Sequence, residues 1–394
     1  MINKKEIEIK LIEAPLIYEG TLPLRKWKKN FGPKIWLKHK FKHNLACCSC
    51  MLACRTDYQI FEGEYKGLKT FTGHHFLPAR AALRLGLEKP EQAIKLLDVC
   101  NRVGLGYFTT TGILNLLSRY TDYLKRDFSE YLKIMEHILN KTGIGDVLAE
   151  GWNVISEKLG INLTEFSEGT GIFKGVDCIQ DGRTTSIDPQ RFSYITNPRP
   201  HHGGTQSIYT LPKMSLQILK DDASHLGINS EEFERIFTET PYYGKFNVAR
   251  FTKHAEDAMA VHNSLGTCIV STLFGTDIIN IEKLVPLYTA LTGIQMTPEK
   301  LKRIGERSFT LYKLLNIREG FKTRDICSEN WLTPKETPEG KKVLMDYYRE
   351  RELSRSDIEK LIDDYYNERK WNPENGIPSK AKLKELKLED FLLM

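Results

Sequence analysis

Four of the eight cysteines of this chain lie within eight residues, in the stretch Cys47-Cys48-Ser49-Cys50-Met51-Leu52-Ala53-Cys54. Three of them, Cys47, Cys50 and Cys54, have the spacing C-x2-C-x3-C. The thiolate is the form of cysteine that binds metals, and this spacing lets three thiolates converge on one compact inorganic centre. The fold must therefore hold this short loop in one conformation and bring a fourth ligand to it from elsewhere.

The local pattern leaves three kinds of site open. A tetrahedral zinc ion and a [4Fe–4S] cluster both need a fourth ligand. A short triplet with a distant fourth cysteine is more typical of a cluster than of a zinc ribbon, which has two C-x2-C pairs. Zinc and unligated or redox-active thiols are the alternatives. Cys48 lies outside the spacing, and the isolated Cys100, Cys178 and Cys327 are expected to be small core residues.

Composition indicates an ordinary soluble globular protein with room for two or three domains, because the 394 residues are 41% hydrophobic and 27% charged. No run reaches the roughly 18 apolar residues of a membrane span, and the N-terminus has no signal-peptide hydrophobic region. We therefore expect a cytoplasmic location, where thiols stay reduced.

The net charge of +6 is uneven, since residues 1–43 contain eleven Lys or Arg and four Glu, a balance of +7. Trp27, Phe31, Trp36 and Phe41 are interleaved with these basic residues, which is a pattern found in nucleic-acid binding. No recognised nucleic-acid motif accompanies it. A solvated segment is the simplest alternative, and attraction of an acidic electron-transfer partner is the functional interpretation that we favour.

The remaining pattern predicts a mainly α fold. Residues 1–45 look extended and irregular with one short strand at 7–11, and residues 62–73 look like a loop. Residues 165–210 are rich in Gly and Pro, which places a domain boundary there and divides the chain into residues 1–185 and 186–394. Predicted helices cover residues 90–103, 112–124, 129–140, 145–158, 213–226, 230–238, 247–264, 277–292, 297–316, 339–352 and 355–369, with a short last helix capped by Ser379.

Further phrases follow the cysteine triplet in order: Asn101-Arg102-Val103-Gly104-Leu105-Gly106, Gly143–Gly151, Asp188-Pro189 with Tyr194–Arg199, Asn263–Cys268, Ile304–Phe321 and Asp364–Pro378. Together they resemble the aldehyde:ferredoxin oxidoreductase family of tungsten enzymes from about Gly20 to the C-terminus. The resemblance implies two helical domains like domains 2 and 3 of that family. In the family these domains close over a tungsten bis-molybdopterin centre with a [4Fe–4S] cluster beside it.

The resemblance also implies the fourth cluster ligand. Cys268 stands where the family has its distant cysteine, so that Cys47, Cys50, Cys54 and Cys268 would form the four-cysteine ligand set of a [4Fe–4S] cluster.

Two elements of the family, both D-x-x-G-L, contact the pterins. Asn101 and Leu105 stand in the first element here, and Asn263 and Thr267 stand in the second, so both aspartates of the family are asparagine. Asparagine can donate and accept hydrogen bonds but brings no negative charge to the ring N–H groups. The family's P-E-Y-E segment is also altered, and Glu64–Lys69 is the nearest match.

The loop after Tyr194–Arg199 carries the candidate catalytic residues. His201 and His202 follow where the family has an active-site histidine, so either could act as general acid or base; two loop histidines without a ligand are the alternative. Arg199 could bind a pterin phosphate or a substrate carboxylate, or form a surface ion pair. The other pair, His74-His75, could bind a metal, but two histidines without a ligand are the interpretation that we favour.

The resemblance implies an oxidoreductase that converts aldehydes to carboxylic acids and passes electrons from tungsten or molybdenum through the cluster to ferredoxin. The family's N-terminal β-rich domain, which carries much of the pterin binding, has no counterpart in this sequence. We therefore expect a separate pterin-binding β-rich chain, a small aldehyde or acyl substrate, and neither membrane nor nucleic acid as a partner. The alternative is a non-catalytic [4Fe–4S] electron-transfer or scaffold subunit that has lost the pterin site.

Overall fold

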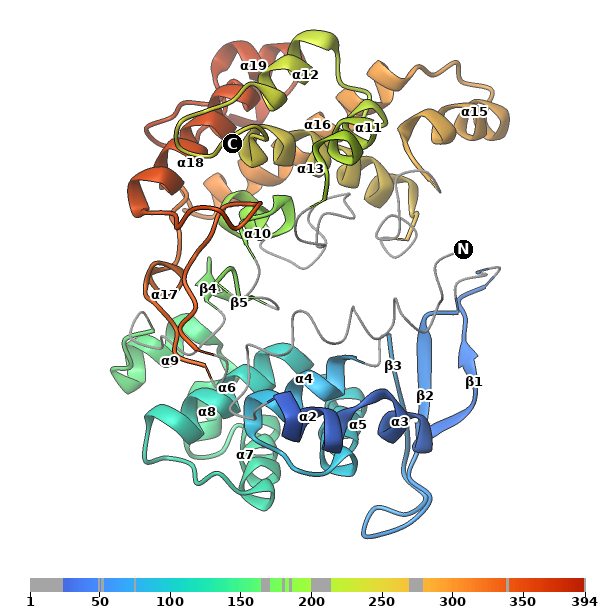
Figure 1. Ribbon diagram of the computed structural model, residues 1–394, viewed down its shortest axis with the longest axis vertical. Coiled ribbons are helices and arrows are strands. Elements are labelled where there is room, and N and C mark those ends of the chain that lie inside the picture. The colour runs from blue at the N-terminus through green and yellow to red at the C-terminus, as the bar shows by residue number, and fades with distance from the viewer. Residues whose placement is uncertain are drawn as a thin grey trace. The chain divides into compact units, whose positions relative to one another are not determined.

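The computed structural model describes residues 24–48, 50, 53–73, 76–163, 171–178, 181–183, 186–199, 214–268, 279–337 and 340–392 (Figure 1). The chain forms two compact units, the first made of residues 1–184 and 329–343 and the second of residues 185–328 and 344–394. Helices dominate both, which confirms the predicted mainly α class. Within the described ranges, no helix is long and apolar enough to cross a membrane.

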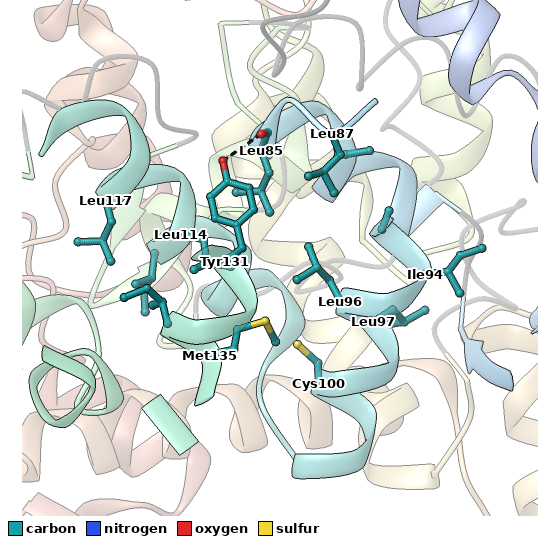
Figure 2. Close-up of a cluster of buried hydrophobic side chains, with 14 of the residues drawn as sticks. Leu85, Leu87, Ile94, Leu96, Leu97, Cys100, Leu114, Leu117, Tyr131 and Met135 are labelled. Carbon is teal, nitrogen blue, oxygen red and sulfur yellow. Dashed lines mark hydrogen bonds between the residues drawn. The ribbon is translucent and has the colours of Figure 1, made fainter. Parts of the chain in front are cut away.

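The first unit combines a helical core with a small antiparallel sheet of strand order β1-β2-β3. Its core is formed by α4 to α7, whose apolar side chains interdigitate in Figure 2. There the hydroxyl of Tyr131 donates to the carbonyl oxygen of Leu85 at 3.1 Å. The elements of this unit are α2 (Leu24–Phe31), α3 (Pro33–Lys38), β1 (Lys40–Leu45), β2 (Arg55–Gln59), β3 (Lys69–Thr72), α4 (Phe76–Leu85), α5 (Pro90–Val103), α6 (Tyr107–Tyr120), α7 (Phe128–Asn140), α8 (Ile144–Ala149), α9 (Trp152–Leu159), β4 (Ile172–Phe173), β5 (Val176–Asp177) and α17 (Glu329–Leu332).

Local signals explain the helices that were predicted correctly in this unit. Pro90 begins α5 because its fixed φ suits the first helical turn, and Gly104 ends it with a left-handed φ of 75°. The predicted helix at 145–158 is instead two helices, α8 and α9. Gly151 separates them with φ 90° and ψ −177°, a conformation that is outside the helical region and that favours glycine.

Part of the prediction for residues 1–45 is wrong, because residues 24–38 are helical. Gly32 and Pro33 divide this stretch into α2 and α3, which are too short to show a clear helical period. They are stabilised by the burial of Phe31 and Trp36 in the core of the first unit. Strand β3 was also missed within the loop predicted at 62–73, and the strand predicted at 7–11 lies outside the described residues.

The second unit is a helical bundle around α13, which packs against α10, α16 and α18. The contact between α13 and α16 is close at Gly305, where a Cβ atom would lie 2.2 Å from the carbonyl oxygen of Asp257. The elements of this unit are α10 (Pro189–Thr196), α11 (Leu216–Ser224), α12 (Ser230–Phe237), α13 (Val248–Leu265), α15 (Ile281–Thr292), α16 (Pro298–Arg318), α18 (Arg355–Arg369), α19 (Lys380–Leu386) and the 3-10 helix η1 (Glu389–Leu392).

Two predictions for the second half of the chain are wrong. No helix occupies the described part of 339–352, because this segment forms isolated antiparallel bridges, one of which pairs Met345 with Glu352. The amide of Ile187 also donates to the carbonyl oxygen of Met345 at 2.9 Å. The second error is α10, which lies inside the region predicted to be irregular. Its N-cap is Asp188, whose side chain accepts from the backbone N–H of Arg191.

Candidate cluster and cofactor site

The three cysteines of the triplet lie on one loop between paired strands. Strand β1 ends at Leu45, β2 begins at Arg55, and these two residues pair in the antiparallel register. The backbone N–H of Cys50 donates to the carbonyl oxygen of Cys47 at 3.0 Å, which closes the C-x2-C segment into a turn. Cys54 directly precedes β2. The two strands therefore bring Cys47 and Cys54 to the same end of the sheet, and the turn adds Cys50.

The exposure of these thiols suits a metal–sulfur centre. Cys47 is exposed, Cys50 and Cys54 are half-buried, and none of the cysteines, all of which are described, forms a disulfide. Cys100 provides the contrast, because it is buried and its burial raises the pKa of its thiol to about 12. A thiol of that kind stays protonated and is a poor ligand. The loop thus offers three thiol ligands, and the chemistry of this donor set fits three corners of a [4Fe–4S] cluster.

Cys268 lies immediately beyond the C-terminal end of α13, in the second unit, and is exposed. It is accessible to an inorganic centre, as a ligand must be. Its role as the fourth ligand stays a prediction.

The first of the two predicted pterin elements forms the C-terminus of α5. The backbone N–H of Leu105 donates to the carbonyl oxygen of Cys100 at 3.1 Å across the left-handed Gly104, an arrangement typical of a Schellman motif. The side chain of Leu105 packs against the core of the first unit. The element is thus a helix cap that places Asn101 on the last turn.

Asn101 uses its amide hydrogens within the protein. Its Nδ2 donates to the hydroxyl oxygen of Thr70 at 3.0 Å and to the carbonyl oxygen of Phe71 at 2.8 Å. Both acceptors belong to β3, so Asn101 fastens α5 to the sheet that carries the cysteine loop. An aspartate at this position could accept hydrogen bonds but could not donate these two.

The second element repeats the same helix ending. Gly266 is left-handed with φ 71°, and the backbone N–H of Thr267 donates to the carbonyl oxygen of His262 at 2.9 Å. Asn263 lies three residues before Gly266, as Asn101 lies three residues before Gly104 in the first element. Its side chain is exposed and forms no hydrogen bond with another described residue, so that it can face a ligand.

His262 was missed by the sequence analysis. It is fully buried, and its Nδ1 lies 2.7 Å from the hydroxyl oxygen of Thr267, which itself donates to the carbonyl oxygen of His262 at 3.1 Å. We therefore assign the ring proton to Nδ1. Burial lowers the pKa of His262 to about 4, so the imidazole is neutral at neutral pH, and Nε2 has no hydrogen-bond partner among the described residues. Its only sequence signal was its place directly before Asn263.

The residues that directly precede the candidate catalytic histidines are held by hydrogen bonds. The backbone N–H of Arg199 donates to the side-chain oxygen of Asn197 at 2.9 Å, and the amide of Asn316 donates to the carbonyl oxygen of Pro198 at 2.6 Å. The side chain of Arg199 is exposed. The predicted catalytic residues His201 and His202 lie outside the described residues, as do His74 and His75.

A buried ionic network lies behind these hydrogen bonds. Asn197 donates to the carboxylate of Glu256 at 3.2 Å, and Glu256 also accepts from Arg369 at 2.8 Å. Arg369 makes a second ion pair with Asp257 at 3.0 Å, and all three charged side chains are fully buried. Sequence reasoning missed this network because its members are distant in sequence.

A second polar cluster, formed by Glu232, His254 and Glu368, has ligand atoms within 4.8 Å of one another. Its carboxylates already have cationic partners, because Lys302 lies 2.6 Å from Glu232 and Arg235 lies 2.9 Å from Glu368. These two cations would repel a metal ion. The cluster is therefore an ion-pair network in the second unit, and we assign no metal to it.

Comparison with known proteins gives a consistent result. The family described as "Aldehyde ferredoxin oxidoreductase, domains 2 & 3" matches residues 12–388. The curated protein "Aliphatic sulfonate oxidoreductase, WOR-like subunit" of Pyrococcus furiosus is 24% identical over 394 residues, which cover 92% of this chain and 54% of that protein. This chain thus spans about half the length of that relative.

A solved structure shares the fold. It is the active site complex BamBC of benzoyl coenzyme A reductase in complex with 1,5-dienoyl-CoA, with a TM-score of 0.70 at 19% sequence identity. The match covers 98% of this chain and 60% of the other. At this identity the likeness concerns the fold.

Proposed function

This chain belongs to the aldehyde ferredoxin oxidoreductase family, whose domains 2 and 3 it matches over most of its length, and we propose that it is the [4Fe–4S]-bearing component of a tungsten–pterin oxidoreductase. The family is one of oxidoreductases. The observation that carries the proposal is the cysteine loop, because the pairing of Leu45 with Arg55 and the Cys47–Cys50 turn gather three accessible thiols at one end of a sheet.

In this proposal Cys47, Cys50, Cys54 and Cys268 hold the cluster. Four thiolates around the cluster set its charge, and the hydrogen bonds and solvent exposure around the sulfur atoms tune its reduction potential. A cluster held by these four cysteines would supply one-electron transfer, and ferredoxin is the acceptor that we propose.

The pterin-bound tungsten, or molybdenum, would supply the two-electron conversion of an aldehyde to a carboxylic acid. Asn263 and Thr267, with Asn101 and Leu105 of the first element, are the residues that we propose to face the pterins. His201 or His202 would accept the proton released from the attacking water and return it to solvent. Arg199, which is exposed just before them, would bind a phosphate or a substrate carboxylate.

A separate β-rich chain is proposed to complete the pterin site. One comparison supports it, because the curated relative is named as a subunit. The solved structure with the same fold is likewise described as a complex. Co-purification from the host with a tag on this chain tests the idea, and recovery of this chain alone, without pterin, would contradict it.

The cluster is tested on anaerobically purified chain by absorption spectrum and metal analysis. We expect about four irons per chain and a broad visible band. Serine in place of Cys50 or Cys54 should abolish both, whereas Cys48→Ser and Cys327→Ser, as matched controls, should retain them. Stoichiometric zinc without visible absorption would overturn the proposal, as would equal loss of iron in Cys48→Ser and Cys50→Ser.

One observation favours a second candidate function, a non-catalytic electron-transfer or scaffold subunit. Asn101 uses its donors on β3, so the first pterin element acts as a structural fastening here. Tungsten and pterin analysis of the complex from the host separates the two functions. The catalytic role predicts both in amounts comparable to this chain, and the scaffold role predicts iron and sulfide without them.

A further inference from the structure

The segment that contains the cysteine loop carries only positive charge. Residues 20–56 include no Asp or Glu, although the whole chain contains 51 of them. The basic residues in this segment are Arg25, Lys26, Lys28, Lys29, Lys34, Lys38, Lys40, Lys42 and Arg55. A cluster with four thiolate ligands is anionic overall. The nine positive charges of this segment exceed the number needed to neutralise the charge of the cluster.

The structure separates the apolar and the basic residues of α2 and α3. Phe31 and Trp36 are 0% and 4% exposed, and both join the core of the first unit. Arg25, Lys29, Lys34 and Lys38 are exposed. None of these four forms an ion pair with another described residue, so their charge is directed to solvent. We call these four residues the basic face.

The chain runs directly from the basic face to the cysteine loop. α3 ends at Lys38, β1 begins at Lys40, and Cys47 follows two residues after β1 ends at Leu45. Among the strands that the structure describes, β1 lies at the edge of its sheet, as Figure 1 also shows. A strand of this length, six residues, spans about 20 Å. A protein contact of standard size covers about 800 Å² on each partner, which is wide enough to reach both the basic face and the loop.

The loop end of the same sheet offers apolar contact area. Leu45 is 40% exposed and Phe71 is 48% exposed, and the guanidinium of Arg55 lies 5.9 Å from the centre of the Phe71 ring. Apolar side chains beside a strongly charged face are typical of transient protein–protein contacts, in which charge guides approach and apolar area stabilises the complex.

Nucleic acid fits this surface less well. Binding to single strands relies on exposed aromatic rings on which bases stack. Phe31 and Trp36 lie between the basic residues, and both are buried. Their interleaving with lysine therefore reflects two short amphipathic helices.

We propose that the basic face, edge strand β1 and the Leu45–Phe71 end of the sheet form the docking surface of a small acidic protein that exchanges single electrons with the cluster. In the forward direction the reduced cluster gives one electron to the oxidised carrier, which becomes reduced by one electron, and no proton or bond is transferred. The exchange rests on the cluster proposed above, whereas docking is measurable without it. Attraction between opposite charges raises association rates by about ten- to a thousandfold and weakens with salt.

The test uses the full chain and an acidic bacterial 2[4Fe–4S] ferredoxin as probe. Affinity is measured by calorimetry, and electron exchange by anaerobic stopped-flow absorption. At low salt, the double variant Lys29→Glu with Lys34→Glu should lower the affinity for ferredoxin and the rate of electron exchange at least about tenfold. At about 0.5 M salt, both values should approach those of the unmodified chain, because salt screens the charges. The matched control is Lys300→Glu with Lys322→Glu. It makes the same charge change at exposed positions of the second unit and should stay within about twofold.

Equal weakening by the two double variants would show that only net charge matters and would overturn the proposal, as would unaltered binding by the first variant. Tighter binding, at equal ionic strength, of basic cytochrome c, phosphatidylserine vesicles or a single-stranded oligonucleotide would also overturn it. Docking is measured on the unmodified chain and on Cys50→Ser. If both proteins contain no iron but still bind ferredoxin in a salt-sensitive way, the cluster function is refuted and the docking surface is retained.

Discussion

The side-chain nitrogen of Asn101 lies 2.8 Å from the carbonyl oxygen of Phe71 and joins the end of α5 to β3. Because Thr70 accepts the second amide hydrogen at 3.0 Å, both donors of the group are used. In the family pattern that this element resembles, the position is aspartate, which has no hydrogen to donate at neutral pH. Asparagine at this position thus supplies a structural contact between α5 and β3.

The first prediction concerns this contact. Asn101→Asp should destabilise the protein by about 1 to 2 kcal/mol, because it removes two hydrogen bonds and brings a carboxylate against a carbonyl oxygen. Asn263→Asp occupies the equivalent place in the second cap, where the side chain forms no hydrogen bond with another described residue, so its cost should remain below about 0.5 kcal/mol. Urea denaturation followed by circular dichroism compares the two variants. Similar costs for both would refute the contact's structural role.

The second prediction concerns acid stability. An unfolded histidine titrates near 6.5, whereas burial lowers the pKa of folded His262 to about 4. Between these values the unfolded chain binds a proton that the folded chain does not. Stability should therefore fall as pH falls from about 6.5 to about 4, by at most about 1.4 kcal/mol per pH unit from this residue. Buried His254 acts in the same direction, because desolvation lowers its pKa well below the usual value.

Denaturation series across this pH range measure the contribution of His262. His262→Gln should flatten the dependence, because the titrating group is gone. Thr267→Val keeps the imidazole but removes its hydroxyl partner, so it should lower stability at every pH and keep the slope. An unchanged slope in His262→Gln would contradict the assignment of a neutral buried imidazole.

The third prediction concerns the packing that positions α13 and, at its end, Cys268. A methyl group at Gly305 would meet the carbonyl oxygen of Asp257 at 2.2 Å and the side chain of Val261 at 2.8 Å. Gly305→Ala should therefore cost about 1 to 3 kcal/mol by forcing α16 away from α13. Gly106→Ala is the control, since nothing lies closer than 4.0 Å to a methyl group there. Thermal unfolding should show a lowered Tm for the first variant alone.

The fourth prediction concerns the buried ion pairs of Arg369. Arg369→Met leaves the carboxylate of Glu256 buried without a cation and leaves Asp257 only its ion pair with Lys253, so it should cost about 3 to 5 kcal/mol. Lys133→Met removes an exposed lysine that pairs with Glu130 on the surface of α7 and should cost less than about 1 kcal/mol. Guanidinium chloride titration compares the two. A small cost for Arg369→Met would show that the network relaxes when its cation is lost.

Local signals predicted much of the helical framework. Helix α5 begins at Pro90 and ends before Gly104 as expected, and Thr297 caps α16 with its side-chain oxygen. Such signals succeed because a cap depends on hydrogen bonds and backbone angles within a few residues. They failed where long-range pairing decides the conformation. The bridge between Met345 and Glu352 replaced a predicted helix, and α2 and α3 depend on burial in a core built by later residues.

For the candidate site, the sequence by itself determined the ligand types, their spacing and the two N-x-x-G caps, because each is written within a few consecutive residues. Tertiary structure alone decided what these groups do in the folded chain. It brought Asn101 to Phe71, 30 residues away, and left the side chain of Asn263, in an otherwise equivalent cap, without a hydrogen bond to another described residue. It also paired Arg369 with Asp257 across 112 residues. The energy of such contacts depends on burial and direction in space, and neither is encoded by the residues next to them in the chain.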